Sequence, residues 1–129
     1  MEPLLLLYNF TEEEQKEWEL ALKPVSVVRK KFVDKKEFGI PIYSLLSEEA
    51  VPTFLYQATE DFDGRMVLIA NVTANTLFQY LLAVSKMVTK EPVYRAVLTE
   101  TNRDWTSSFL FYHLKEEEAE IKKRRTAEG

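Results

Sequence analysis

The sequence predicts an α/β fold built from a duplicated β-α-β-α unit, whose four strands form a mostly parallel sheet with helices packed on it. Two continuous apolar runs, Leu4–Tyr8 and residues 66–70, each end in an asparagine and are each followed by a helical pattern. Alternating strands and helices favour parallel pairing through right-handed crossovers. Two like units would most simply pair their first strands at the centre. An α+β ferredoxin-like arrangement is the alternative.

The first half opens with a strand at Leu4–Tyr8, whose unbroken apolar character predicts burial on both faces. Thr11 and Glu14 have the spacing of a capping box, so we expect a helix to start there and to end at residue 22. The valines of residues 25–28 predict a short second strand. Residues 41–46 begin with a proline, which suits the first turn of a short helix.

An acidic linker is expected over residues 48–64, and its run at 60–64 has the composition of a turn. Residues 53–58 fit a strand or a helix, and a connection without a strand is favoured. The next buried strand, at 66–70, leads to Thr73, which we expect to cap a helix over residues 74–88.

The segment that ends the predicted fold runs from Val93 to Trp105. Its apolar first half predicts a strand, and its second half is a polar corner, Thr-Glu-Thr-Asn-Arg-Asp-Trp. We expect the helix that follows to bury Trp105 and Phe109 together with Tyr112 and the pair Leu110 and Leu114. It then continues into a charged end.

The two halves can be laid on each other as sequences. Asn9 and Asn71 stand 62 positions apart, and so do Trp18 and Tyr80 in the two predicted helices. We therefore interpret the chain as one domain with an internal repeat. The expected boundaries are 1–118 for the domain, 3–47 and 65–118 for the repeats, 48–64 for the linker, and 119–129 for a charged helix end or disordered tail.

Composition excludes several classes of function. The net charge of −4 argues against a nucleic-acid partner. No stretch approaches the roughly 20 apolar residues that span a bilayer, so no membrane contact is expected. The chain has no cysteine, which removes disulfides and thiolate chemistry and suits a cytoplasmic location.

Few residues have the chemistry of a catalytic or cofactor site. Three glycines are too few for a dinucleotide fingerprint or a phosphate loop. His113 is the one histidine, and Ser107 and Ser108 lie six and five residues away, so they do not share its helix face. Asp61 and Asp63 resemble the start of a calcium loop but lack its downstream glutamate. We therefore expect no cofactor, no metal and no catalytic residue.

The second half also resembles a known family. Residues 95–105 read Arg-Ala-Val-Leu-Thr-Glu-Thr-Asn-Arg-Asp-Trp, and they follow an apolar strand with a capped helix. This pattern is similar to a small prokaryotic domain family of unknown function. The resemblance covers residues 65–118, and residues 3–47 match as a divergent copy that lacks the corner. It implies the boundaries given above, and no activity comes with it.

The polar corner is the strongest candidate site. A structural role is the favoured interpretation, because Thr101 or Asn102 can cap the next helix and Trp105 can pack inward. As a site, it would lie where open α/β sheets bind ligands, beyond the carboxyl ends of the strands. Arg103 could then meet an anion that Asn102 and Thr99 orient. The turns at Asn9 and Asn71 are expected on the same edge and complete the candidate set.

Three functional hypotheses follow. The first is a non-enzymatic domain that acts through protein contacts, with a partner or as a dimer, because the helix over residues 77–88 has a broad apolar face. The second is a module that binds an anionic small molecule at the strand-end edge around Arg103. The third, an enzyme, is the least favoured, because it would have to work without histidine or cysteine.

Overall fold

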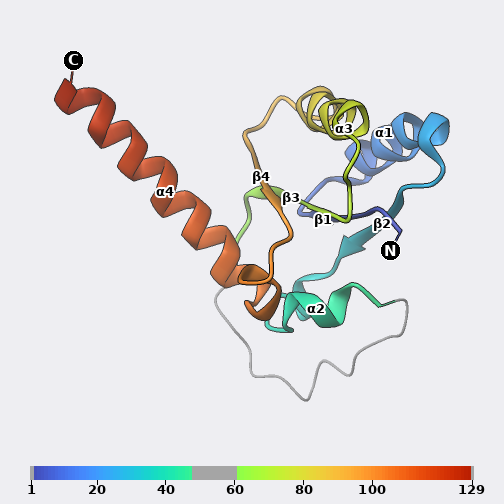
Figure 1. Ribbon diagram of the computed structural model, residues 1–129, viewed down its shortest axis with the longest axis horizontal. Coiled ribbons are helices and arrows are strands. Elements are labelled where there is room, and N and C mark those ends of the chain that lie inside the picture. The colour runs from blue at the N-terminus through green and yellow to red at the C-terminus, as the bar shows by residue number, and fades with distance from the viewer. Residues whose placement is uncertain (1, 48–60, 129) are drawn as a thin grey trace.

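The computed structural model describes residues 2–47 and 61–128, and Figure 1 shows a sheet with helices on both faces. Residues 53–58 and most of the expected linker lie outside the described ranges. In order along the chain, the elements are β1 Leu4–Tyr8, α1 Glu12–Leu22, β2 Arg29–Val33, α2 Ile42–Leu45, β3 Arg65–Ala70, α3 Asn75–Met87, β4 Val93–Val97 and α4 Ser107–Glu128. Short 3-10 turns occur at Lys23–Val25, Lys35–Glu37 and Asn102–Asp104.

The four strands lie in the order β2-β1-β3-β4, with β1 parallel to β2 and β3 parallel to β4. The central pair, β1 and β3, is antiparallel, and Leu6 lies opposite Leu68 in its middle. The predicted α/β class with a mostly parallel four-stranded sheet is confirmed. The ferredoxin-like alternative is wrong, because that fold splits its β-α-β units whereas here each unit's two strands are direct neighbours.

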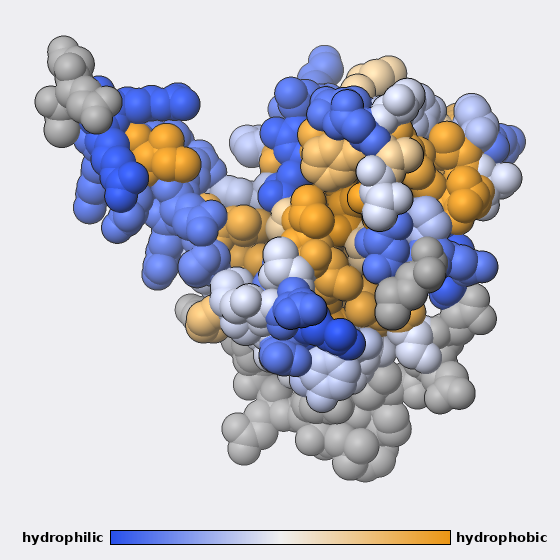
Figure 2. Space-filling view, viewed as in Figure 1, coloured by the Kyte–Doolittle hydropathy of each residue, from blue (hydrophilic) through white to orange (hydrophobic). Residues whose placement is uncertain are grey.

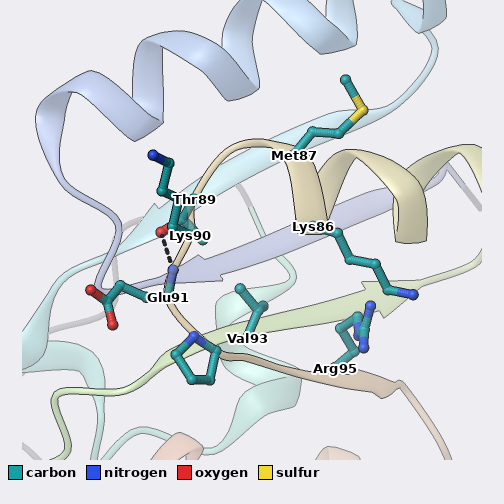
Figure 3. A pocket seen from close by; sticks show the side chains of 8 residues that line it. Lys86, Met87, Thr89, Lys90, Glu91, Val93 and Arg95 are labelled. Atoms are coloured by element: carbon teal, nitrogen blue, oxygen red, sulfur yellow. Dashed lines mark hydrogen bonds between the residues drawn. The ribbon is translucent and has the colours of Figure 1, made fainter.

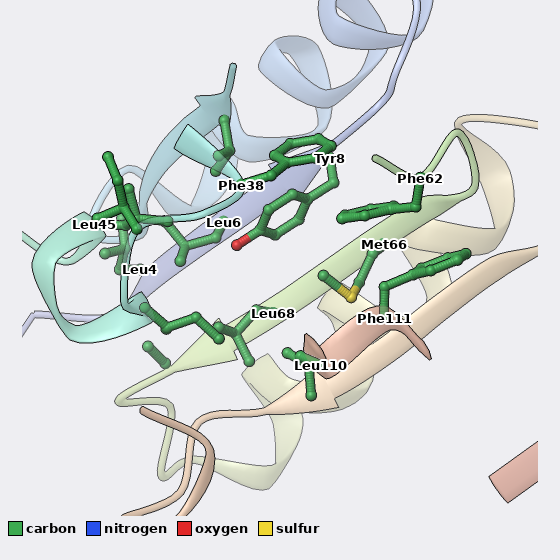
Figure 4. Close-up of a cluster of buried hydrophobic side chains, with 14 residues drawn as sticks. Leu4, Leu6, Tyr8, Phe38, Leu45, Phe62, Met66, Leu68, Leu110 and Phe111 are labelled. Atoms are coloured by element: carbon green, nitrogen blue, oxygen red, sulfur yellow. The ribbon is translucent and has the colours of Figure 1, made fainter. Parts of the chain in front are cut away.

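Both faces of β1 and β3 are buried, as their unbroken apolar sequences predicted. Leu5 and Leu7 point to the face that α1 and α3 cover, together with the fully buried Trp18. Leu4 and Leu6 point to the opposite face, which α2 and the first turns of α4 cover (Figure 4). The molecule therefore has three layers, and the sheet separates two apolar clusters.

The capping box at the start of α1 is present as expected. The Thr11 hydroxyl accepts from the Glu14 N–H at 3.2 Å, and the Glu14 carboxylate accepts from the Thr11 N–H at 2.9 Å. The same carboxylate accepts from the Arg65 guanidinium at 2.8 Å, which joins α1 to β3. Burial opposes ionisation of Glu14, but hydrogen bonds from Arg65 and Thr89 outweigh it and hold the pKa of this carboxyl below its usual range.

The start of α3 differs from the prediction. Thr73 does not cap this helix, because α3 begins at Asn75 with Ala74 at its N-cap and no side-chain bond. The turn before α3 is thus one residue longer than the turn before α1. In consequence Trp18 corresponds in space to Leu81, which is equally buried, and not to the exposed Tyr80.

The second strand also lies elsewhere than predicted. Residues 25–28 were expected to form it, but the strand is the basic stretch Arg29–Val33, and Arg29 pairs with Leu4. β2 is an edge strand, so polar side chains are tolerated along it and its apolar neighbours are not required to enter the ladder.

The inward face of α4 was predicted in part, since Leu110 is buried and Tyr112 and Leu114 pack against the core, but Phe109 does not. Phe109 is 56% exposed, whereas Leu110 and Phe111 are buried, because the 3-10 turn at Asn102–Asp104 delays the start of the helix to Ser107.

The Ser107 hydroxyl shares a buried 2.7 Å hydrogen bond with the hydroxyl of Tyr8. Burial raises the pKa of Tyr8 far above its usual range.

Phe62 is a core residue that the sequence interpretation missed. Its segment is irregular, as a linker and turn should be, yet Phe62 is only 3% exposed. Its ring stacks between Phe38, with centroids 4.4 Å apart, and Phe111, with centroids 4.3 Å apart (Figure 4). Residue 62 therefore ties the segment before β3 to α4.

Candidate functional site

The polar corner after β4 is held by a closed set of hydrogen bonds. The Asn102 side-chain oxygen accepts from the Thr99 N–H at 2.9 Å, and the Thr99 hydroxyl accepts from the Asn102 N–H at 3.0 Å. The Asn102 amide nitrogen donates to the Val97 carbonyl at 3.0 Å. Asn102 is 7% exposed, so its polar atoms serve the loop and are not presented to a ligand.

Replacing Asn102 by alanine is expected to lower the free energy of unfolding by about 1 kcal/mol, because the Thr99 N–H and the Val97 carbonyl each lose a part-buried hydrogen bond. Chemical denaturation followed by circular dichroism measures this loss. The matched control is Arg103→Ala, at a neighbouring exposed position, which should change stability by less than about 0.5 kcal/mol. Equal losses in the two variants would contradict the structural role of Asn102.

The other residues predicted for this site do not converge on one point. Thr101 and Arg103 are exposed, while Trp105 is half-buried and packs edge-on against two rings of α4. Its centroid lies 4.8 Å from that of Phe109 and 4.9 Å from that of His113. Trp105 therefore positions the start of α4. This agrees with the structural role that the sequence favoured for the corner.

The expectation that the Asn9 and Asn71 turns share an edge is wrong. Because β1 and β3 are antiparallel, their carboxyl ends lie at opposite ends of the sheet, measured along the strands. Asn71 lies at the same end as the corner after β4, since β3 and β4 are parallel, and Asn9 lies at the opposite end. A single site cannot contain both asparagines.

Both asparagines instead hold the backbone of the opposite half. Each has a positive φ, 63° at Asn9 and 61° at Asn71, which asparagine tolerates better than most residues. The Asn9 amide donates to the carbonyls of Phe62 and Gly64, just before β3, at 2.8 and 3.0 Å. The Asn71 amide donates to the carbonyl of Glu2, just before β1, at 3.3 Å. Each turn thus fixes the start of the other half's first strand.

The outer side of β4 is a feature that sequence reasoning did not single out. Leu98 donates its N–H to Ile69 of β3, and N–H groups alternate sides along a strand, so those of Arg95 and Val97 point away from the sheet. No strand of the described residues pairs with this side. Asn102 covers the carbonyl of Val97, which leaves the groups at Val93 and Arg95 open.

The two edges of the sheet differ in how they are protected. The other edge strand, β2, presents three consecutive basic residues, Arg29, Lys30 and Lys31. Charged side chains of this kind discourage pairing with another chain. Along β4 only Arg95 is charged, and the strand reads Val-Tyr-Arg-Ala-Val. The β4 edge is therefore the better template for an added strand.

Helix α4 passes the β4 edge and projects from the body of the molecule (Figure 1). One stripe of this helix, together with β4, lines a groove of about 530 Å³; the helix residues are Leu114, Glu117, Glu118, Ile121, Lys122 and Arg125. Ile121 is 50% exposed on this arm, which Figure 2 shows as hydrophilic with an apolar patch. Hydrogen bonds from Lys122 and Tyr94 lower the pKa of Glu118.

The broad apolar face expected for the helix at 77–88 is mostly used inside the protein. Leu81, Val84 and Val88 are buried against the sheet. What remains exposed is Met87, at 80%, and Tyr80, whose hydroxyl donates to a backbone carbonyl of α1 at 2.6 Å. These side chains line a shallow groove of about 470 Å³ between α1 and α3.

A second hollow, also of about 470 Å³, gathers cationic side chains at the end of α3 and the start of β4. Lys86, Lys90 and Arg95 line it with one acidic residue, Glu91. Figure 3 shows Lys86 and Arg95 on one side of this pocket and Lys90 on the other. It lies at the amino end of β4, away from the corner that contains Arg103.

The described residues contain no group of three or more histidine, aspartate or glutamate side chains placed to hold a metal ion. Within the same residues, no helix is both long enough and apolar enough to cross a membrane. The ring of His113 contacts Trp105, and its Nε2 lies 3.0 Å from a carboxylate oxygen of Glu117, one turn along α4.

Residues 65–121 match the model of a family described as a domain of unknown function, DUF3783. The match confirms the resemblance expected for residues 65–118. It runs from the start of β3 into α4, so it contains the corner, the β4 edge and the groove-lining stripe as far as Ile121. No curated protein and no solved structure matches the chain significantly.

Proposed function

We propose that the protein acts without catalysis, through protein contacts made at the outer side of β4 and the adjoining stripe of α4. One observation carries the proposal: an open strand edge lies beside a projecting helix that keeps an apolar residue, Ile121, half exposed. A strand added to β4 would satisfy the free N–H and C=O groups of Arg95. It would also lie against Leu114 and Ile121 and remove them from water.

The apolar stripe of α4 supports this use of the edge. Leu110 is buried on the sheet, Leu114 is half-buried, and Ile121 lies two turns farther along the same face. These leucines and Ile121 share one side of the helix, on which Glu117 and Glu118 stand between Leu114 and Ile121. The face therefore continues beyond β4 into space that an added segment can fill, whereas the end of an ordinary surface helix has no need of such a residue.

A proline at Arg95 tests the proposal. It removes the outward N–H without breaking the ladder to β3, since proline is tolerated where the N–H of an edge strand faces solvent. Arg95→Ala is the matched control, because it removes the same side chain and keeps the N–H. Each variant is used as bait for proteins from the cells that make this chain, and bound proteins, including wild-type copies of the chain itself, are quantified by mass spectrometry.

We expect at least one binding partner to be retained by Arg95→Ala and lost by Arg95→Pro. Identical sets of bound proteins for the two variants would overturn the proposal. Thermal unfolding of both variants establishes that the proline is accommodated within a folded domain.

Binding of an anionic small molecule is a second candidate function, favoured by the gathering of Lys86, Lys90 and Arg95 around one pocket. Inorganic phosphate, pyrophosphate and citrate are suitable probes, because a bound ligand raises the apparent melting temperature by mass action. A shift lost in Lys86→Ala and kept in Arg103→Ala would support this pocket. The reverse pattern would move the site to the corner, and no shift with any probe would contradict the candidate.

We further infer that the chain is one domain made of two related units, and we propose a prokaryotic source and a cytoplasmic location. The matching backbone conformations of Asn9 and Asn71, and their matching bonds to the opposite half, support the repeat. The absence of cysteine from the sequence fits a reducing compartment. The prokaryotic source rests on the sequence resemblance.

A further inference from the structure

We propose that the occupant of the β4 and α4 surface is a second copy of this chain, in a twofold dimer whose α4 helices run antiparallel and cross near Ile121. This inference rests on the proposed function and names its partner. The observation behind it is the distribution of charge along the projecting part of α4.

The charges of this arm are divided at Ile121. The four residues Glu116, Glu117, Glu118 and Glu120 precede it, and the four residues Lys122, Lys123, Arg124 and Arg125 follow it. Between Glu116 and Arg125 each half of the arm thus carries one sign, with the apolar side chain at the boundary; Lys115 and Glu128 lie outside this segment. Within one helix this division supports ion pairs four residues apart, such as Glu118 with Lys122 at 2.9 Å. Between two helices it also makes the arm complementary to a reversed copy of itself.

An antiparallel pair of these helices places unlike charges opposite each other. When Ile121 of one copy meets Ile121 of the other, Glu117 and Glu118 lie across from Arg125 and Lys122 of the second copy. All four charged positions belong to the stripe that lines the groove beside β4. A parallel pair would oppose acid to acid and base to base. The arm is therefore complementary to itself in one direction, which is the requirement of a twofold interface.

The charges direct the pairing and the apolar residues supply most of its stabilisation. Glu117 already pairs with His113, and Glu118 with Lys122 at 2.9 Å, so the acids have partners within their own helix. Charges that stay near solvent contribute more to orientation and specificity than to affinity. Leu114 and Ile121 of both copies lie on the stripe that borders β4, so the second copy's α4 would lie beside the outer side of β4.

Charge reversal tests the arrangement directly. One variant combines Glu117→Lys with Glu118→Lys, so that its stripe is wholly basic, and the other combines Lys122→Glu with Arg125→Glu, so that its stripe is wholly acidic. The full chain is used throughout. The mass in solution is measured by light scattering over a dilution series, and native mass spectrometry identifies which copies associate.

The wild-type chain is expected to be a dimer. Each variant alone should dimerise at least about tenfold more weakly, since like charges then oppose each other. An equimolar mixture of the two should form the heterodimer, with an affinity at or above that of the wild type. This restoration also establishes that both variants are folded, because a misfolded chain would not be rescued by its counterpart.

Three results would overturn the inference: a wild-type chain that is monomeric at every concentration, variants that dimerise as well as the wild type, or a mixture that does not associate. Failure here is distinguishable from failure of the proposed function. If the wild type is monomeric but the Arg95→Ala and Arg95→Pro baits still retain different proteins, the β4 edge serves another partner. If the baits also behave alike, both proposals fail.

Discussion

Replacing Trp18 by alanine is expected to lower the free energy of unfolding by about 3–5 kcal/mol, the range for a large aromatic side chain removed from a core. Trp18 has no exposed surface, and it packs edge-on against Phe10 with ring centroids 5.6 Å apart. The truncation leaves a cavity between α1 and the sheet that neighbouring side chains fill only in part. Urea unfolding of the wild type and the variant measures the difference.

The matched control is Trp18→Phe, which keeps most of the apolar volume. No described residue accepts a hydrogen bond from the Trp18 indole N–H, so removal of that group leaves no acceptor without a partner. We expect the phenylalanine variant to lose clearly less stability than the alanine variant. Equal losses would mean that the indole N–H, and not the volume of the ring, makes the contribution.

Phe62→Ala is expected to lower the free energy of unfolding by a similar amount, about 3–5 kcal/mol. The Phe62 ring is stacked on both sides, so its removal separates Phe38 from Phe111 and loosens α4 from the sheet. Thermal denaturation gives the change in stability, and near-ultraviolet circular dichroism follows the loss of aromatic packing.

The adjacent exposed position supplies the comparison for Phe62. Asp61→Ala alters the same irregular segment without touching the stacked rings, so its melting temperature should stay close to that of the wild type. A comparable decrease in both variants would show that the segment's backbone, and not the Phe62 ring, stabilises the fold.

Local signals predicted the parts of the fold that depend on local physics. The apolar runs predicted β1 and β3, because a strand that is buried on both faces needs apolar side chains at every position. The pair Thr11 and Glu14 predicted the start of α1, because the two residues of a capping box lie within one helical turn. The α/β class followed from the alternation of these elements.

What escaped prediction depends on contacts between distant residues. The direction in which β1 meets β3 is not encoded in either strand, so Asn9 and Asn71 were placed at one edge when they lie at two. Phe62 stands in an acidic run, and only its neighbours from α4 and the region after β2 make it a core residue.

The candidate site was predicted in part. A structural role for the corner followed from its residues, but the expected cap was wrong: α4 begins at Ser107 with the Thr106 hydroxyl accepting from the Phe109 N–H, and Asn102 bonds within the loop. Short polar side chains favour such local bonds at turns. The β4 edge was missed because a strand's position in the sheet is a property of the whole topology. Lys30 and Lys31 protect the other edge strand, but the second strand was expected at residues 25–28, so this contrast with β4 could not be seen from the sequence.

The central antiparallel pair also has a consequence for how the chain folds. Leu4 pairs with Ala70 and Tyr8 with Met66, so closing the middle of the sheet requires residues 58 to 66 positions apart to meet. Such non-local pairing slows folding. During synthesis β1, α1 and β2 emerge first. The side of β1 that pairs with β3 then has no partner strand until β3 has left the ribosome. The nascent first half is therefore the stage at which this chain is most exposed to aggregation.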